Sequence, residues 1–466
     1  MTAATRSMNE AQLTDGDEPL GARMARAVAG LSAGDLPSAV TGKVKLCLLD
    51  LIGCAFESRN LPWSRQAVAM AALANGNAIV IGSDRTATYG DAAFANAVMG
   101  HGLVREDMHS GSISHLGIVV LPTLLALAQH KRSGGRDFIA AAAVGYEVGG
   151  RIGRAVMDAE VARIHRPTGV TGPVAGAAAG ARLLGLSAEQ ACSAIALGAN
   201  TTVGFNQWAH TGGSEMFFQA GFAARNALTA ARLAELGAFA SPSALDGEAG
   251  LFAAFGKRAA AAKVELFRGQ PEILSVYHKP VPACNFAQTA CQAALTIARD
   301  AGCAPDSIAA IEVRVPRAGA LYPGCDFTGP FAHILQAKMS IQYNVAAALI
   351  EGSVSEKNFT LLDDPRLHRL IGVMTLHVDD RMTQAYPGMQ GGEVEVRQRD
   401  GATHRIRLDD VVNATPSDVR ERFRVAAADA LGADRARQIE DSIDALERSD
   451  DVGRLVSLLR APDEPK

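Results

Sequence analysis

The stretch TGPVAGAAAGARLL, residues 171–184, decides the fold of this chain. It consists almost entirely of alanine, glycine and other apolar residues, and Arg182 is its only charge. Because a helix of this composition has almost no polar face, we expect it to lie buried at the centre of a bundle. Its small side chains would let the backbones of neighbouring helices come close. The stretch therefore predicts a mainly helical protein.

Helical patterns continue on both sides of this buried segment. Residues 39–56 place apolar side chains at the spacing of one helix face, namely Val40, Val44, Leu48, Leu51 and Ile52. Further helices are predicted at residues 23–31, 121–130, 137–155, 189–199 and 221–236. Together these segments predict an all-helical domain over residues 21–272.

The pattern changes near Ile273, where alternating strands appear. Residues 311–315 alternate in this way, and two more such runs, 393–397 and 404–408, flank Asp400-Gly401 and predict a hairpin. Helices are predicted at residues 287–301 and 340–350, and charged helical sequence returns from Ser417 to about Leu459. We therefore predict a smaller α+β domain, residues 273–412, inserted before residues 413–462, which return to the helical domain. Residues 1–20 are predicted to be a flexible leader.

Composition limits the possible compartment and partners. The chain has 466 residues, which is too long for one ordinary core. Its formal net charge is -4, so no global field draws it to nucleic acid or to an anionic membrane. The seven cysteines form no CxxC motif and suggest reduced thiols in a cytoplasmic protein. The apolar runs are too short to span a bilayer.

Ionisable residues concentrate in the segment VREDMHSGSISHLG, residues 104–117. Such density between apolar helices indicates a functional site, although a solvated loop is the alternative. Asp107, His109 and His115 could supply the two histidines and one carboxylate of a metal site. Their spacing matches no standard metal pattern, so we predict no metal at this place.

Three other segments could also carry chemistry. Thr168 and Gly169 open the buried helix, where free backbone N–H groups can bind an anion, unless they simply begin an ordinary capped helix. In the segment YHKPVPACNF, residues 277–286, two prolines hold Lys279 and Cys284 on a stiff backbone, which could equally be a rigid linker. Residues 206–216 give a weaker signal for a specificity loop. A phosphate loop is absent from the sequence, and so is a dinucleotide fingerprint in its strand-then-helix context.

In this order, these segments resemble the MmgE/PrpD family, which includes 2-methylcitrate dehydratase and cis-aconitate decarboxylase. Residues 104–109, with His115-Leu116-Gly117 at the family spacing, resemble its Asp-Phe-Asp-Asp-Thr-His and His-Pro-Gly motifs. Similar matches are RPTG at 166–169 to His-Pro-Thr-Gly, KPVPAC at 279–284 to Lys-Pro-Tyr-Pro-Ala-Cys, and AKMSIQY at 337–343 to Ala-Lys-Phe-Ser-Leu-Pro-Tyr. The resemblance covers roughly residues 20–460.

The resemblance implies an all-helical domain with an inserted α+β lid-like domain, a homodimer, and chemistry without metal or organic cofactor. Family members make or trap a carbanion next to a carboxylate. His115 would be the general acid/base, with His109 or His165 as its partner. The residues expected to bind the carboxylates or the rest of the substrate are Lys279, Arg105, Arg166, Thr168, Asp107 and Cys284.

The chain also departs from the family pattern at five positions of this expected site. They are Val104, Met108, Arg166, Met216 and Cys284, where the family carries acidic, hydroxyl, histidine, lysine and, in one branch, histidine side chains. Our leading hypothesis is a hydro-lyase for a small di- or tricarboxylate. The alternatives are an isomerase or epimerase, a decarboxylase, and a ligand-binding protein that has lost catalysis.

Overall fold

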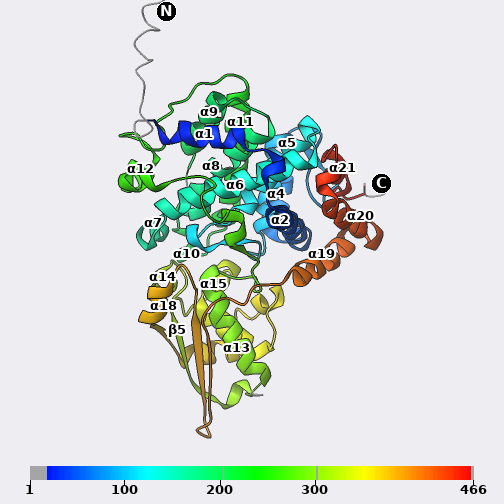
Figure 1. Ribbon diagram of the computed structural model, residues 1–466. Coiled ribbons are helices and arrows are strands. Elements are labelled where there is room, and N and C mark those ends of the chain that lie inside the picture. The colour runs from blue at the N-terminus through cyan, green and yellow to red at the C-terminus, as the bar shows by residue number, and fades with distance from the viewer. Residues whose placement is uncertain (1–17, 203, 301–302, 463–466) are drawn as a thin grey trace, which may run out of the picture.

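A computed structural model describes residues 18–202, 204–300 and 303–462 of the chain (Figure 1). It is mainly helical, which confirms the predicted fold class, and a smaller α+β part lies below the helices in Figure 1. The longer helices of the upper part are α1 (Leu20–Gly30), α2 (Ser38–Ser58), α3 (Pro62–Ala71), α4 (Tyr89–His101), α5 (Gly117–Lys131), α6 (Gly135–Val156), α8 (Pro167–Leu183), α9 (Ala188–Ala199) and α11 (Glu215–Glu235).

Helix α8, which contains the alanine- and glycine-rich stretch, lies at the centre of this part. It packs against α5, α6, α9 and α11, and its side chains are buried apart from Arg182. A Cβ atom on Gly176 would lie 2.6 Å from Cβ of Ala227, and one on Gly180 would lie 2.7 Å from Cβ of Ala231. These approaches are too close for a side chain, so the glycines let α11 pack against the α8 backbone.

Short elements complete the upper part. The short helices are α7 (Ala159–Ile164), α10 (Trp208–Thr211) and α12 (Leu251–Ala254). The 3-10 turns in the described residues, those of the α+β part included, are Ala33–Asp35, Ser110–Ser112, Arg258–Lys263, Glu272–Ser275, Asn285–Ala287, Pro305–Ser307, Glu356–Thr360 and Leu446–Arg448. Strands β1 (Ala78–Ile79) and β2 (Thr86–Ala87) pair with each other, and β3 (Met108–His109) pairs with β4 (Val276–Tyr277). The β3–β4 pair fixes the ionisable loop against the segment that leads into the α+β part.

The α+β part contains a four-stranded sheet in the order β6-β5-β7-β8. Its strands are β5 (Ile308–Val315), β6 (Met374–Val378), β7 (Gly392–Gln398) and β8 (Thr403–Leu408). Strand β5 is parallel to β6 and antiparallel to β7, while β7 and β8 form the hairpin predicted around Asp400-Gly401. Its helices are α13 (Gln288–Asp300), α14 (Arg317–Leu321), α15 (Ile334–Met339), α16 (Ile341–Glu351), α17 (Pro365–Gly372) and α18 (Asp380–Ala385).

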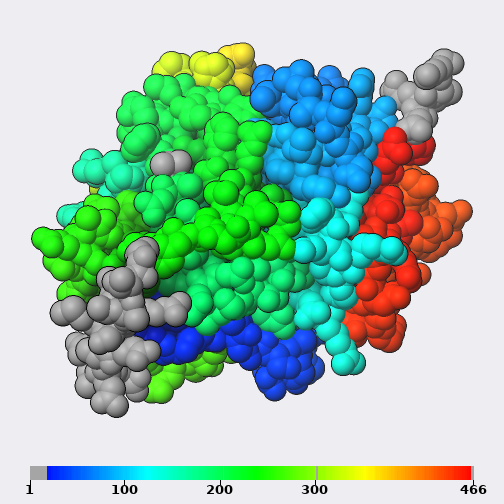
Figure 2. Space-filling view, turned by 90° about the horizontal axis from the view of Figure 1, so that it is seen from above, coloured from blue at the N-terminus to red at the C-terminus, as the bar shows by residue number. Residues whose placement is uncertain are grey.

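The last helices return to the helical part, along its side (Figures 1 and 2). They are α19 (Pro416–Leu431), α20 (Ala433–Asp444) and α21 (Gly453–Leu458), with α19 packed on α2 and α21 on α5. The domain boundaries proposed from the sequence stay predictions, and most of the predicted leader, residues 1–17, lies outside the described residues. Among the described helices, none combines the length and apolar character needed to cross a membrane.

Candidate active site between the two parts

The loop between α4 and α5 borders a small cavity where the two parts meet. Val104 and Ile113 lie in this loop with left-handed backbones, at φ 58° and 52°. This conformation is costly for β-branched residues and persists where the surroundings impose it, which is common at functional sites. Two buried lysines hold the start of this loop, because Lys279 donates to the carbonyl of Val104 and Lys338 Nζ donates to the carbonyl of Leu103 at 3.2 Å.

The cavity has a volume of about 20 Å³, which is enough for about one water molecule. Both parts of the fold contribute to its wall. The helical part supplies Val104, Met108, Ile113, His115, Arg166 and Met216, and the α+β part and its leading segment supply Cys284, Asn285, Phe286, Tyr322 and Met339. The cavity therefore exists only while the two parts are closed on each other.

A buried carboxylate links two histidines in the floor of this site. Glu106 Oε1 lies 2.5 Å from His101 Nδ1 and 2.8 Å from His115 Nδ1. On its other side, His101 Nε2 accepts a hydrogen bond from Arg166 Nη2 at 3.0 Å, so His101 carries its proton on Nδ1, toward Glu106. His115 turns Nδ1 to the same carboxylate, which leaves Nε2 as the nitrogen that can take up a proton.

The charges of this group follow from burial. Burial lowers the pKa of His115 to about 3, although Glu106 opposes the shift. Burial alone would raise the pKa of Glu106, but His101 and His115 hold it well below its usual range. His115 is therefore neutral at pH 7 and can act as a base, while the Glu106 carboxylate would stabilise the imidazolium that forms. Burial also lowers the pKa of Lys279 to about 8.

Arg166 caps the start of α8 and reaches across the cavity to the α+β part. Its Nη1 donates to the Tyr322 hydroxyl at 3.3 Å, and its guanidinium lies over the Trp208 ring, 5.7 Å from the centroid. Arg166 is buried, yet it has no carboxylate partner within residues 18–202, 204–300 and 303–462. A bound anion would therefore stabilise this buried cation of the cavity wall.

Two of the predicted residues, Thr168 and Asp107, make hydrogen bonds that support the loop carrying His115. Thr168 Oγ1 accepts a hydrogen bond from the backbone N–H of His115 at 3.1 Å. Asp107 accepts one from the Tyr146 hydroxyl at 2.8 Å, and burial raises the pKa of Asp107 to about 8. A Cβ on Gly117 would lie 2.2 Å from Asp107 Oδ1, so glycine at this position is needed for the loop to close on itself.

Three further residues predicted for the site lie outside the cavity wall. Arg105 pairs with Glu57 through both guanidinium nitrogens. His109 Nε2 lies 2.7 Å from Glu272 Oε2, in a separate buried network. His165 is only half buried and does not line the cavity. Of the predicted residues, His115, Arg166 and Cys284 line the cavity, and Lys279 and Thr168 contact its wall.

Sequence reasoning did not assign His101, Glu106 or Tyr322 to the site. His101 ends an apolar helix five residues before Glu106, and a single histidine at that place was a usable signal. Tyr322 is one of only six tyrosines and precedes Pro323-Gly324, but its contact with Arg166 depends on the approach of the two parts.

A metal ion is one alternative occupant of the site. The ligand atoms of His101, Glu106 and His115 lie within 4.8 Å of one another, which is a different set from the one considered on sequence grounds. A divalent cation there would lie beside the positive charges of Arg166 and Lys279, which disfavours it. The absence of a metal cofactor stays a prediction, to be tested with a chelator.

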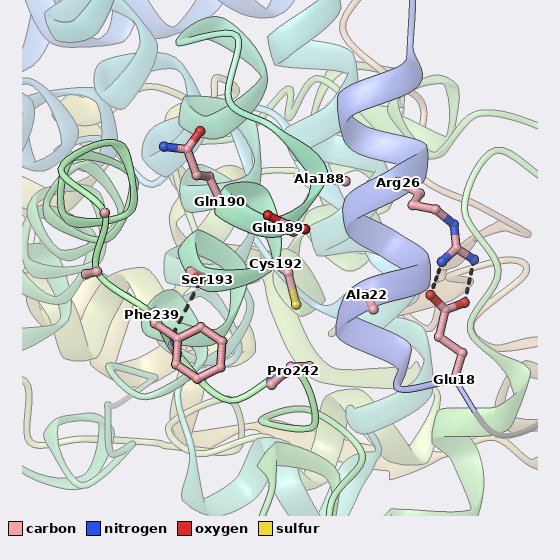
Figure 3. Close-up of a pocket in the computed structure, with 13 residues that line it drawn as sticks. Glu18, Ala22, Arg26, Ala188, Glu189, Gln190, Cys192, Ser193, Phe239 and Pro242 are labelled. Atoms are coloured by element: carbon pink, nitrogen blue, oxygen red, sulfur yellow. Dashed lines mark hydrogen bonds and ion pairs between the residues drawn. The ribbon is translucent and has the colours of Figure 1, made fainter. Parts of the chain in front are cut away.

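A larger hollow of about 580 Å³ lies elsewhere, between α1, α9 and residues 237–242 (Figure 3). Arg26 pairs with Glu18 at its edge, and Ser193 Oγ accepts a hydrogen bond from the N–H of Ala240 at 3.3 Å. The residues that line it include no histidine, and these polar groups already have partners. The smaller cavity is therefore the better candidate for an active site.

A mainly helical part, a smaller α+β part and a buried histidine–glutamate group between them indicate an enzyme with its site where the two parts meet. The comparisons identify the family. The chain belongs to the MmgE/PrpD family, because the MmgE/PrpD N-terminal domain matches residues 22–263 and the MmgE/PrpD C-terminal domain matches residues 281–448. It is an enzyme of this family.

Several curated relatives match nearly the whole chain. Cis-aconitate decarboxylase of Aspergillus terreus is 26% identical and covers 93% of this chain and 94% of its own length. The cis-aconitate decarboxylase-like protein oryM of Aspergillus oryzae is 28% identical, over 93% of this chain and 95% of its own length. Human cis-aconitate decarboxylase is 27% identical, over 95% of both chains.

Proposed function

We propose that this protein is a lyase that needs no cofactor and acts on a small carboxylic acid through a carbanion next to the carboxylate. The observation that carries the proposal is His115, a buried neutral histidine beside Glu106 in the wall of a cavity that also contains Arg166, which has no carboxylate partner among the described residues. The family and its decarboxylase relatives support a lyase, and dehydration of a di- or tricarboxylate is the reaction we expect.

In the dehydration, Arg166 holds the substrate carboxylate and spreads the charge of the developing enolate. His115 Nε2 takes the proton from the neighbouring carbon, and Glu106 stabilises the imidazolium. The carbanion then expels hydroxide from the next carbon, and the proton on His115 completes the departing water. Closure of the two parts excludes bulk water from these steps.

Decarboxylation is the second candidate, because the named relatives are cis-aconitate decarboxylases. In that reaction the substrate loses CO2, and His115 would have to be protonated first so that it can deliver a proton to the carbanion. An isomerase would instead need a second acid/base group in the cavity wall, for which Cys284 is the available side chain. The homodimer and the cytoplasmic location also stay proposals based on the family resemblance.

A proton NMR time course in D2O tests the proposal. The full chain would be mixed in turn with citrate, 2-methylcitrate, cis-aconitate and related mono- and dicarboxylates, with and without chelator. Loss of water, loss of CO2 and uptake of deuterium without net conversion give different spectra and so identify the reaction class. Binding of these acids without any spectral change would contradict a lyase and favour the ligand-binding alternative.

The His115→Asn variant tests the assigned base. We expect the rate to fall about 10²-fold or more, because the proton acceptor is lost. The matched control is His377→Asn, which removes an exposed histidine from β6, and we expect it to react at the wild-type rate. His109→Asn and His165→Asn would decide between His115 and the other histidines considered from the sequence.

A further inference from the structure

Among the described residues, Arg166 and Lys279 are buried cations of the site without an acidic partner within ion-pair distance, and Lys279 instead donates to the carbonyl of Val104. Arg105 pairs with Glu57, and Lys338 lies 2.6 Å from Glu356 Oε2. Arg166 is 5% exposed and is contacted only by neutral groups in the portion of the chain that the structure describes, namely Tyr322, His101, Met216 and the Trp208 ring. A buried guanidinium without a counter-charge is costly, and a bound carboxylate would remove that cost.

The charges around the cavity leave room for only one such carboxylate. Arg166 and Lys279 both act on His101, Lys279 also acts on His115, and Glu106 is the carboxylate that lies between these two histidines. One positive charge is therefore left uncompensated among these groups. Cys284 also lines the cavity, and any thiolate there would add negative charge and make a second carboxylate less favourable. A bound tricarboxylate would bring three negative charges into a site that has about one uncompensated positive charge.

The rest of the wall is apolar. Six of its eleven residues are hydrocarbon, thioether or phenyl side chains, namely Val104, Met108, Ile113, Met216, Phe286 and Met339. The polar groups other than Arg166, His115 and Cys284 are Asn285 and Tyr322. Asn285 accepts from the Tyr277 hydroxyl and donates to Gln390, whereas the Tyr322 hydroxyl accepts from Arg166 and can donate its own proton to a carboxylate held there. The apolar side chains favour an alkyl group over further carboxylates, because they offer a second carboxylate no donor.

From this arrangement we infer that the substrate is a monocarboxylate, with its one carboxylate on Arg166 and an apolar group against the methionine-rich wall. The inference rests on the proposed reaction and replaces the di- or tricarboxylate substrate expected from the sequence with a monocarboxylate. A monocarboxylic acid of four to six carbons has the single negative charge required. A 3-hydroxyl group makes it a substrate for dehydration, and a 2,3-double bond makes it the corresponding product.

Ligand-induced thermal stabilisation of the full chain gives the first test. The probes are 3-hydroxybutanoate and 2-methylbut-2-enoate, with one carboxylate, malate with two, and citrate and cis-aconitate with three. We expect the monocarboxylates to bind at least about tenfold more tightly than the tricarboxylates, as a charge left unpaired in a buried site costs at least this much. Tighter binding of citrate or cis-aconitate, or no stabilisation by any probe, would overturn the inference.

Two variants connect the result to named residues. Arg166→Gln should weaken binding of the preferred monocarboxylate by about 100-fold, whereas Arg314→Gln, which removes an arginine of β5 paired with Glu393, should leave it unchanged. Met216 Sδ lies 3.6 Å from Arg166 Nη2, so Met216→Lys should add a second cation and shift the preference toward malate. If Arg166→Gln or Met216→Lys does not fold, the relative affinities of the wild-type chain for the mono-, di- and tricarboxylate probes still test the inferred substrate class.

The inferred substrate class and the proposed lyase reaction can be contradicted independently. Monocarboxylates that bind tightly but show no deuterium uptake and no loss of water or CO2 would support the inferred ligand and contradict the lyase. Turnover of cis-aconitate or citrate, with no binding of monocarboxylates, would support the lyase and contradict the inferred ligand.

Discussion

Glu106 gives His115 both its orientation and a counter-charge for its protonated form. We predict that Glu106→Gln lowers kcat/KM by roughly 10²-fold or more, because the imidazolium loses its stabilising carboxylate. Glu106 raises the pKa of His115 against the effect of burial, so this pKa should fall further in the variant. The acid limb of the pH–rate profile, where His115 becomes protonated and inactive as a base, should therefore move to lower pH.

A matched control is Glu395→Gln, which changes a glutamate of the β7–β8 hairpin that pairs with Arg405. We expect its pH–rate profile to match the wild type. A Glu106→Gln enzyme with an unchanged rate and acid limb would show that Glu106 only supports the fold of the loop.

For single residues, the sequence indicated candidate site residues that belong to short motifs along the chain. His115, Arg166 and Cys284 each belong to a short segment with a recognisable pattern, and all three line the cavity. Arg105 and Glu106 are adjacent in the sequence, but Arg105 pairs with Glu57 on α2 while Glu106 contacts His101. Charge density in a loop predicts that a site is present, but side-chain direction depends on partners that are distant in the chain.

Among the elements, α8 depends most on the absence of side chains. We predict that Gly176→Val lowers the free energy of unfolding by at least about 1–3 kcal/mol, because its Cβ would meet Cβ of Ala227 and separate α8 from α11. Gly42→Ala on α2 is the control, since nothing lies within 4 Å of the added Cβ. That change should stabilise the protein by about 0.4–1 kcal/mol.

Urea unfolding of both variants checks this prediction. Equal effects of the two substitutions would mean that α8 and α11 can move apart without loss of packing.

The elements that the sequence failed to predict are those without a usable pattern. Helix α4 is buried over Asp91–His101, so its residues show no alternation of apolar and polar faces. Strand β6 is mostly exposed or half buried and lies at the sheet edge, where its pairing with β5 is not encoded locally. By contrast, the β7–β8 hairpin was predictable because Asp400-Gly401 separates two alternating runs.

Across the whole molecule, buried histidines make stability depend on pH. Burial lowers the pKa of His101, His109, His115 and His278. In the unfolded chain these groups titrate near pH 6.5, so below that pH the unfolded state binds more protons and the free energy of unfolding falls. Each histidine contributes up to about 1.4 kcal/mol per pH unit. Asp107 opposes them, because its pKa is raised to about 8 and its protonated form is favoured in the fold.

Urea unfolding between pH 5 and 7.5 checks this sign. We expect stability to decrease as the pH falls through this range, with the steepest loss below pH 6.5. His278→Asn, which lies outside the cavity wall, should reduce the slope by about one proton. Stability that increases toward pH 5 would show that the raised pKa of Asp107 outweighs the histidines.

The volume of the cavity has a kinetic consequence. A space of about 20 Å³ cannot hold a carboxylic acid, so the residues of the cavity wall must move apart into an open form before such a ligand can bind. If this open form is a minor population, the measured affinity is weakened in proportion to its fraction, and the observed association rate levels off at high ligand concentration at the rate of opening. Tyr322→Phe, which removes the hydroxyl that Arg166 contacts across the cavity, would then change apparent affinity through the conformational equilibrium as well.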